Sequence, residues 1–215
     1  EKALTLEKAG FSPVAAPDAG GSLIISDQFL FDSSVVDPEN ISDHSLTYFV
    51  DSLRSGDDNL SYSVVSGIED LSGNVGTNIG KNEAVINNWT AEHLGLEIGD
   101  TLRMEYRTVT TSGNLETFNS SVEVAAIVNI SGLFAERNLI PPIEGITGEV
   151  SCTTWDPGFE VDLNSIEDED LNYWDLYRTT PKVFINLEEA REMWSSRWGD
   201  TTALLIENDN QAETI

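Results

Sequence analysis

The stretch EAVINNWTAEHLGLEIGDTL, residues 83–102, decides the fold of this chain. Its apolar run at 84–86 is typical of a strand that is buried on both faces. Two asparagines follow, and their side-chain oxygens can cap a short helix over 89–94. Gly95 ends that helix because glycine adopts the left-handed conformation at little cost, and the Gly-Asp pair at 99–100 turns the chain into a second strand. Strand, short helix, turn and strand in this order indicate a corner of a small β-barrel.

The composition favours a folded and strongly acidic domain. The chain has 215 residues, of which 40 % are hydrophobic, so it can bury a sizeable core as one large domain or two small ones. It has 38 Asp and Glu against 11 Lys and Arg, which gives a formal net charge of −27. Such a surface repels the phosphates of nucleic acids and the headgroups of anionic lipids, which excludes DNA and RNA as partners. The charge serves either solubility, as in a medium rich in salt or divalent ions, or attraction of a basic partner.

Neither disulfides nor membrane spans are expected. Cys152 is the single cysteine of the sequence, so there is no disulfide framework and no paired-thiol metal site. No apolar run approaches the ~18–20 residues that a membrane helix needs. Because the sequence starts at Glu1 without a starter methionine or a signal peptide, we expect both ends to be cut from a longer protein. A fragment from between membrane spans and a processed secreted protein both fit this pattern.

Further strands and one long helix are predicted on both sides of the opening stretch. Residues 46–53 fit a helical face as well as a strand, but the turn signal SGDDN and the alternation at 61–68 favour a hairpin. Alternation also predicts a long hairpin over 102–110 and 115–130. Other strands are predicted at 22–31, 183–185 and 201–206, and a helix runs from the capping residue Asn186 to Gly199 with Leu187, Ala190, Trp194 and Trp198 on its apolar face.

Residues 131–180 lack this regularity. A segment of this length without periodicity is usually either functional or disordered. Its aromatic residues argue against disorder, so we expect an ordered excursion that packs on the body or is presented to a partner. The strand–helix–strand pattern that follows is a split βαβ element. It predicts that the chain leaves one subdomain near residue 80 and re-enters it near residue 181.

No constellation of residues predicts catalysis. His44 lies in a polar loop and His93 in the last turn of a helix, where a cation is favoured, so surface or capping roles are expected for both. Cys152 lies far from both in sequence and has no nucleophile signature around it. The sequence contains no phosphate-binding loop, no dinucleotide-binding glycine pattern and no nucleophile elbow. We therefore predict a protein that is not an enzyme, with no catalytic residue and no cofactor.

The acidic run Glu167–Asp170 is the one candidate for a metal site. Calcium needs roughly six or more oxygen ligands, usually from a spaced Asp-x-Asp-x-Asp-Gly loop. The run lacks that spacing, so a solvated group of charges is preferred and no metal ligand is predicted. An acidic chain also offers many carboxylate pairs of the kind that glycosidases use, and nothing singles one out.

The aromatic residues of the excursion form the candidate site. Tryptophan is costly to expose, and it needs a partner for its N–H when it is buried. These side chains therefore either fix the excursion on the body or form a recognition surface, where Trp and Tyr are enriched. The candidate partner surface consists of Trp155, Phe159, Tyr173, Trp174 and Tyr177.

Three stretches in order make the chain resemble the large extracytoplasmic domain of FtsX-like ABC-transporter permeases, the group that includes MacB-like exporters and lipoprotein-release permeases. They are LTYFVDSLRSGDDNLSYSVVSGI at 46–68, EAVINNWTAEHLGLEIGDTLRMEY at 83–106 and SCTTWDPGFEVDLNSIEDEDLNYWDLYRTTPKVFINLEEAREMW at 151–194. Together they span most of the chain after residue 45. The third stretch suggests a branch of large permeases with an extended excursion.

The resemblance implies an α+β fold with two subdomains. The outer, porter-like α+β module is expected at 1–80 plus 181–215 and an inserted β-rich, barrel-like module at 81–130, with the excursion 131–180 packed on the body. Glu1 and Ile215 are expected to lie toward the membrane. The implied role is a non-catalytic domain at the extracytoplasmic face of the cell membrane that couples ATP-driven motion of the membrane helices to the handling of substrates or partner proteins. Expected partners are the permease's own transmembrane helices, an ATPase subunit or domain, and an extracytoplasmic protein or substrate.

Two other classes of protein are alternatives to the permease domain. The Leu-Gly-Leu and Gly-Asp corner is also similar to double-psi barrels, which occur in oxidoreductase cofactor domains and in DNA-binding swapped hairpins. The net charge argues against DNA, and a cofactor domain would need more chain around it. The second alternative is a secreted adhesin or a carbohydrate-binding module, which the acidic surface and the aromatic residues would also fit.

Overall fold

The computed structural model describes residues 6–35, 41–110 and 112–206. The strands are β1 (Phe11–Ala16), β2 (Gly21–Ser26), β3 (Asp43–Ser55), β4 (Asp58–Ile68), β5 (Glu83–Asn87), β6 (Thr101–Val109), β7 (Leu115–Val128), β8 (Val183–Asn186) and β9 (Ala203–Ile206). The α-helices are α1 (Leu71–Val75), α2 (Asn88–His93), α3 (Asp168–Tyr177) and α4 (Leu187–Trp194). Short 3₁₀ turns cover Leu6–Ala9, Ser33–Val35, Gly132–Ala135, Arg137–Leu139, Cys152–Thr154 and Leu163–Ser165.

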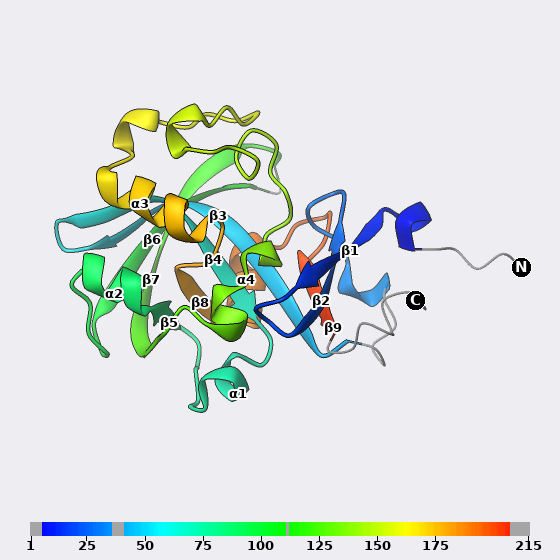
Figure 1. Cartoon of the computed structure of the whole chain (residues 1–215), viewed down its shortest axis with the longest axis horizontal. Coiled ribbons are helices and arrows are strands. Elements are labelled where there is room, and N and C mark those ends of the chain that lie inside the picture. The colour runs from blue at the N-terminus through cyan, green and yellow to red at the C-terminus, as the bar shows by residue number, and fades with distance from the viewer. Residues whose placement is uncertain (1–5, 36–40, 111, 207–215) are drawn as a thin grey trace, which may run out of the picture.

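All these strands belong to one sheet that partly closes on itself. The nine strands follow the order β1-β2-β9-β3-β4-β8-β5-β7-β6, and β6 pairs back onto β3. Six of them, β3-β4-β8-β5-β7-β6, form a barrel, and β1, β2 and β9 extend the sheet at one end of the molecule (Figure 1). The β4–β8 and β5–β7 pairs are parallel and the remaining pairs are antiparallel.

The predicted mixed α+β fold with a barrel is confirmed, and the barrel takes strands from the ranges of both expected modules. Residues 81–130 supply three strands of the barrel, β5, β6 and β7. The other three, β3, β4 and β8, come from the ranges assigned to the outer module. The two ends of the chain do share a sheet, since β9 pairs with both β2 and β3. The barrel is therefore built from strands of both ranges.

The opening stretch folds as its sequence predicts. Strand β5 is almost wholly buried, and Asn87 caps α2 by accepting a hydrogen bond from the Thr90 N–H. Gly95 has a φ of 59°, a left-handed conformation that glycine adopts at the least cost. Leu94 and Leu96 then turn inward and join the core of the barrel.

Two predicted elements are shorter than expected, for tertiary reasons. The strand predicted at 22–31 stops at Ser26, and the chain turns through Phe29, whose φ is 68°. The helix predicted to reach Gly199 ends at Trp194. Gly199 instead lets the backbone of Phe31 approach, since a Cβ at this position would lie 2.2 Å from the Phe31 carbonyl carbon. Trp198 is consequently exposed and does not continue the apolar face of the helix.

The excursion 131–180 is ordered and packs on the barrel. Its own small core consists of Ile146, Cys152, Trp155 and Trp174, and this core contacts the outer faces of Phe49 and Tyr62. The acidic run begins α3, where Glu167 and Asp170 form a reciprocal capping box. Among the described residues, no helix combines the length and apolarity that crossing a bilayer requires.

Candidate functional site

A groove opens where the barrel seam separates. Strands β3 and β6 pair only over three residues, Ser52–Arg54 with Arg103–Glu105. Beyond Glu105 the two strands diverge, and a groove of about 680 Å³ lies between them. Its walls are β3, the tip of the β6–β7 hairpin, the loop after α4 and short pieces of the 29–30 loop and the excursion.

An irregularity in β3 and β4 accompanies this divergence. Val50 pairs with Ser63 and Ser52 pairs with Ser61, so Asp51 and Tyr62 are passed over in the ladder. Tyr62 has a φ of 47°, which is uncommon for a residue other than glycine. The register is the same on both sides of this break, so neither strand carries an extra residue. Asp51 lines the groove, and its carboxylate reaches Arg107 on β6.

A charge pair spans the open seam. Arg107 donates Nε and Nη2 to the Asp51 carboxylate at 2.6–3.1 Å, and Nη2 also donates to the carbonyl of Glu160 at 2.9 Å. The hydrogen bonds that Arg107 donates to Asp51 raise the pKa of Arg107, so its guanidinium stays charged. The Tyr48 hydroxyl donates to the carbonyl of Arg107 at 2.8 Å. The pair therefore links β3, β6 and the excursion at the base of the groove.

The rest of the groove is apolar and open. Four large apolar side chains on its walls are exposed by 41–62 %, and contiguous apolar surface of this kind usually marks an interaction site. The guanidinium of Arg197 lies 4.6 Å from the centre of the Trp198 ring, which holds the tryptophan at the rim. The four side chains are Val109, Leu115, Phe159 and Trp198.

Most of the predicted aromatic surface is buried. Trp155, Tyr173 and Trp174 are each at most 5 % exposed, so they fix the excursion on the barrel and present no surface. Trp155 and Trp174 meet edge to face at 5.0 Å. Tyr177 is half-buried against Tyr173. Of the five predicted residues, Phe159 alone is exposed at the groove.

Trp198, Val109 and Leu115 are the groove residues that sequence reasoning missed. A signal was present for each. Trp198 stands between an arginine and a glycine in a polar segment, and Val109 and Leu115 flank a hairpin turn where the core has no need of apolar residues. Apolar side chains in such places are typical of surfaces that bind something.

A second polar centre, buried under the excursion, is structural. The side chains of Lys182 and Asp170 are 4 % and 5 % exposed, with Nζ and Oδ1 3.8 Å apart. Lys182 Nζ donates to Ser63 Oγ at 3.0 Å and lies 4.7 Å from the ring centre of Tyr173. Burial lowers the pKa of Lys182 to about 8 and raises that of Asp170. The adjoining cavity of about 20 Å³ has room for one water molecule and none for a substrate.

His44, His93 and Cys152 lie on different elements, and each histidine has a local partner. His44 Nδ1 pairs with Glu69, whereas His93 Nδ1 bonds to the carbonyl of Trp89 at 2.7 Å. Burial raises the pKa of Cys152 to about 12, so its thiol is not a nucleophile at neutral pH. Across residues 6–35, 41–110 and 112–206, no group of three or more His, Cys, Asp or Glu is placed to hold a metal ion.

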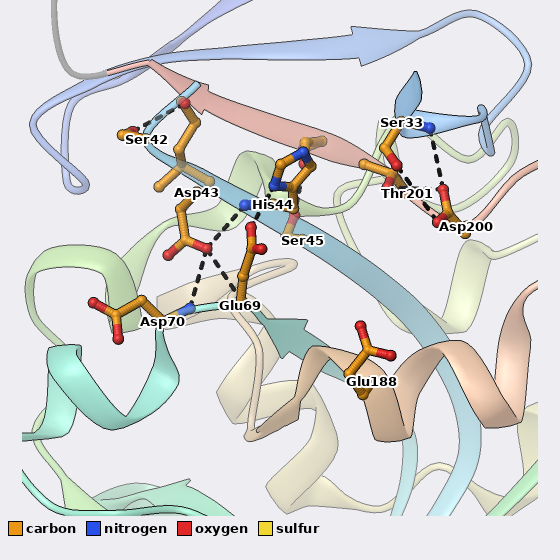
Figure 2. Close-up of polar contacts among 12 residues, drawn as sticks. Ser33, Ser42, Asp43, His44, Ser45, Glu69, Asp70, Glu188, Asp200 and Thr201 are labelled. Carbon is orange, nitrogen blue, oxygen red and sulfur yellow. Dashed lines mark hydrogen bonds and ion pairs between the residues drawn. The ribbon is translucent and has the colours of Figure 1, made fainter. Parts of the chain in front are cut away.

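An acidic cluster marks the place where β3 begins beside β9. Asp43 Oδ1 accepts the backbone N–H groups of His44, Glu69 and Asp70 at 2.8–3.3 Å (Figure 2). These bonds join the start of β3 to the chain that leaves β4. Burial raises the pKa of Asp43 to about 6 despite the three donors. The cluster therefore positions backbone and carries a carboxyl group that is costly to ionise.

The Asp43→Asn variant is expected to gain stability relative to the wild type as the pH rises. The folded-state pKa of about 6 lies above the value of 3.8 for a free aspartate, so protonation of Asp43 stabilises the fold below about pH 4 and this contribution is lost above about pH 6. Asparagine keeps the acceptor oxygen without the charge. The difference in unfolding free energy between variant and wild type should shift by about 3 kcal/mol between pH 4 and pH 7.5.

Urea unfolding at several pH values measures this shift. Asp57→Asn, in the exposed turn between β3 and β4, changes the net charge equally and serves as the control. A difference between Asp43→Asn and wild type that stays constant with pH would contradict the raised pKa.

No protein-family model matches this chain, and no curated protein is significantly similar to it.

Proposed function

We propose that this chain is a non-catalytic extracytoplasmic domain of an FtsX-like ABC-transporter permease. In this role it couples ATP-driven motion of membrane helices to the handling of a substrate or partner protein outside the cytoplasm. Its partners are the permease's transmembrane helices, an ATPase subunit or domain, and a molecule that binds the groove. The proposal rests on the resemblance of the three stretches at 46–68, 83–106 and 151–194 and on one feature of the sheet.

That feature is the path of β3 between the two ends of the molecule. Its first residues, Asp43–Ser45, pair with β9, which also pairs with β2. Its last residues, Ser52–Arg54, pair with β6 at the seam where the groove opens. Strands rise about 3.3 Å per residue, so β3 connects these places as one element roughly 40 Å long.

Strand β3 could transmit motion from the end of the molecule where it pairs with β9 to the groove where it pairs with β6, because both pairings are made by one continuous strand. Strands β1, β2 and β9 lie together at one end of the molecule, with the barrel and the excursion at the other (Figure 1). Two membrane helices that continue from neighbouring strands of one sheet would move these strands together. Glu1 and Ile215, expected toward the membrane, lie outside the described residues. In this proposal, β1, β2 and β9 belong to the outer module and β5, β6 and β7 to the inserted one.

A secreted carbohydrate-binding module is the second candidate. The exposed rings of Trp198 and Phe159, beside the polar pair of Asp51 and Arg107, are the observation that favours it. Sugars stack on exposed aromatic rings and bond to such polar groups. The two candidates place the chain differently, because the permease domain stays attached to the cell and the module is released.

Labelling of cysteine in intact cells tests the proposed function. The experiment uses the longer protein from which we expect this sequence to be taken, here called the parent protein, with the substitution Ile98→Cys at a position that is 66 % exposed. Intact cells that produce it are treated with a maleimide that cannot cross the membrane. We expect the variant in the membrane fraction to be labelled more strongly than the wild type, because Cys152, the one cysteine of this 215-residue sequence, is buried. Labelling that requires permeabilised cells would overturn the proposal, and labelled protein in the medium would favour the secreted module. The parent reading frame should also encode four or more hydrophobic spans around this segment.

A further inference from the structure

The groove side of β6 presents a main-chain edge. Successive residues of an antiparallel strand direct their N–H and C=O groups to alternate sides. Thr110 bonds toward β7, since its N–H donates to the carbonyl of Asn114 at 2.8 Å. Arg107 and Val109 therefore direct their backbone groups toward the groove. Within the part of the chain that the structure describes, β6 pairs with no strand on this side beyond Glu105.

One of these main-chain groups already has a partner. The carbonyl of Arg107 accepts the Tyr48 hydroxyl at 2.8 Å. The N–H of Arg107 and both backbone groups of Val109 face the groove, and an added strand would bond to these groups. Edges of this kind recruit extended peptides by β-augmentation, in which main-chain bonds supply affinity and side-chain pockets supply specificity.

The side chains around this edge suit an extended peptide with apolar residues at alternate positions. Side chains of a strand alternate between its two faces, so every second residue of an added strand meets the same wall. That wall is formed by Leu115, Phe159 and Trp198, which are exposed and apolar. A groove of about 680 Å³ accommodates several such side chains.

Charge selects among the possible occupants. The chain carries a formal net charge of −27, and the exposed Glu116 and Glu160 stand beside the groove residues Leu115 and Phe159. Of the charged residues that line the groove, Asp51 and Arg107 neutralise each other at the base, and Arg197 at the rim lies over the ring of Trp198. A second copy of the chain would bring an equal negative charge to the contact, and a lipid tail has no groups to bond to the β6 edge. A peptide with Lys or Arg between its apolar residues satisfies the edge, the wall and the charge.

We infer that the groove binds an extended basic peptide segment of a partner protein, added as a strand to β6 from Arg107 to Val109. Its alternate apolar side chains pack against Trp198, Phe159 and Leu115, and its basic side chains face the acidic surface. The inference deepens the proposed function, on which it rests only for the partner's location outside the cytoplasm.

A displayed peptide library tests this inference with the 215-residue chain itself. Its ten-residue members carry Val, Ile, Leu or Phe at alternate positions and any residue between them. We expect selection to enrich Lys and Arg at the free positions. For a selected synthetic peptide, Trp198→Ala should raise the Kd about tenfold or more, as is usual for an interfacial tryptophan. Ile98→Ala, an equally exposed apolar position that does not line the groove, should leave the Kd unchanged.

Backbone methylation separates strand addition from simple apolar contact. N-methylation of the peptide nitrogens that face β6 should weaken binding at least about tenfold, whereas methylation of the alternate nitrogens should have little effect. Equal effects in both registers, or no enrichment of basic residues, would overturn the inference. Self-association of the chain, or displacement of the peptide by a neutral detergent with no change on methylation, would assign the groove to another occupant. Because binding is measured in solution, these results are independent of the labelling in cells.

Discussion

Replacement of Lys182 by methionine is expected to lower the free energy of unfolding by about 3–5 kcal/mol. Methionine preserves most of the volume of the side chain against Trp89 and Tyr173, so the packing loss is small. The main cost is electrostatic, because Asp170 becomes a buried carboxyl group without its cation. Burial already disfavours both charges, as the lowered pKa of Lys182 and the raised pKa of Asp170 indicate. The attraction between the two charges offsets part of the cost of burying them.

Urea unfolding of three proteins at pH 7 measures this effect. The double variant Lys182→Met with Asp170→Asn removes both charges and retains an acceptor oxygen for the Ser61 and Glu167 N–H groups. It should recover at least half of the stability lost by the single variant. A single variant within about 1 kcal/mol of wild type would show that the pair does not hold the excursion on the barrel.

The free energy of unfolding of the wild type should also depend on pH because of the buried charge of Lys182. The pKa of Lys182 falls from 10.5 to about 8 on folding, so between these values the unfolded state binds more protons. This group alone therefore makes the fold more stable as the pH rises from about 8 to about 10.5. The rise should be missing in the Lys182→Met variant, which separates a charge effect from a packing effect.

Local patterns in the sequence predict local structure well. The asparagine cap, Gly95 and the Gly-Asp turn define the corner around α2, because each acts on its immediate neighbours. Alternation locates the β3–β4 and β6–β7 hairpins for the same reason, although β3 begins three residues before the predicted strand. The start of α3 was missed, even though Glu167 and Asp170 have the spacing of a capping box.

Features that depend on distant parts of the chain could not be predicted from local patterns. Strand β8 enters the barrel between β4 and β5, an order that no segment specifies by itself. Lys182 precedes an ordinary apolar strand, and its buried partner Asp170 comes from α3, a distant part of the excursion. The groove depends on Asp51 and Arg107, which lie 56 residues apart and meet where the seam opens. Trp194 and Trp198 share a predicted helical face, and they separate because Phe31 packs on Gly199 and the helix stops.

Replacement of Leu94 by aspartate is expected to unfold the barrel. Leu94 is 1 % exposed in the barrel core, where an uncompensated charge costs several kcal/mol. A domain of this kind has a total stability of roughly 5–15 kcal/mol, so most of it would be lost. Ile98→Asp introduces the same charge four residues later at an exposed position and should stay within about 0.5 kcal/mol of wild type. Unchanged melting of Leu94→Asp would show that the Leu-Gly-Leu corner is not packed as described.

Calorimetry of Leu94→Asp also decides whether residues 81–130 form a module of their own. Strands β5, β6 and β7 share the barrel with β3, β4 and β8, so damage at Leu94 should spread through all six. We therefore expect the wild type to melt in one cooperative transition that the substitution shifts as a whole. Two wild-type transitions, of which only one moves, would show that an inserted module unfolds independently. In that case the inserted module and the rest of the chain would move as two bodies, with β3 transmitting motion between them through a hinge.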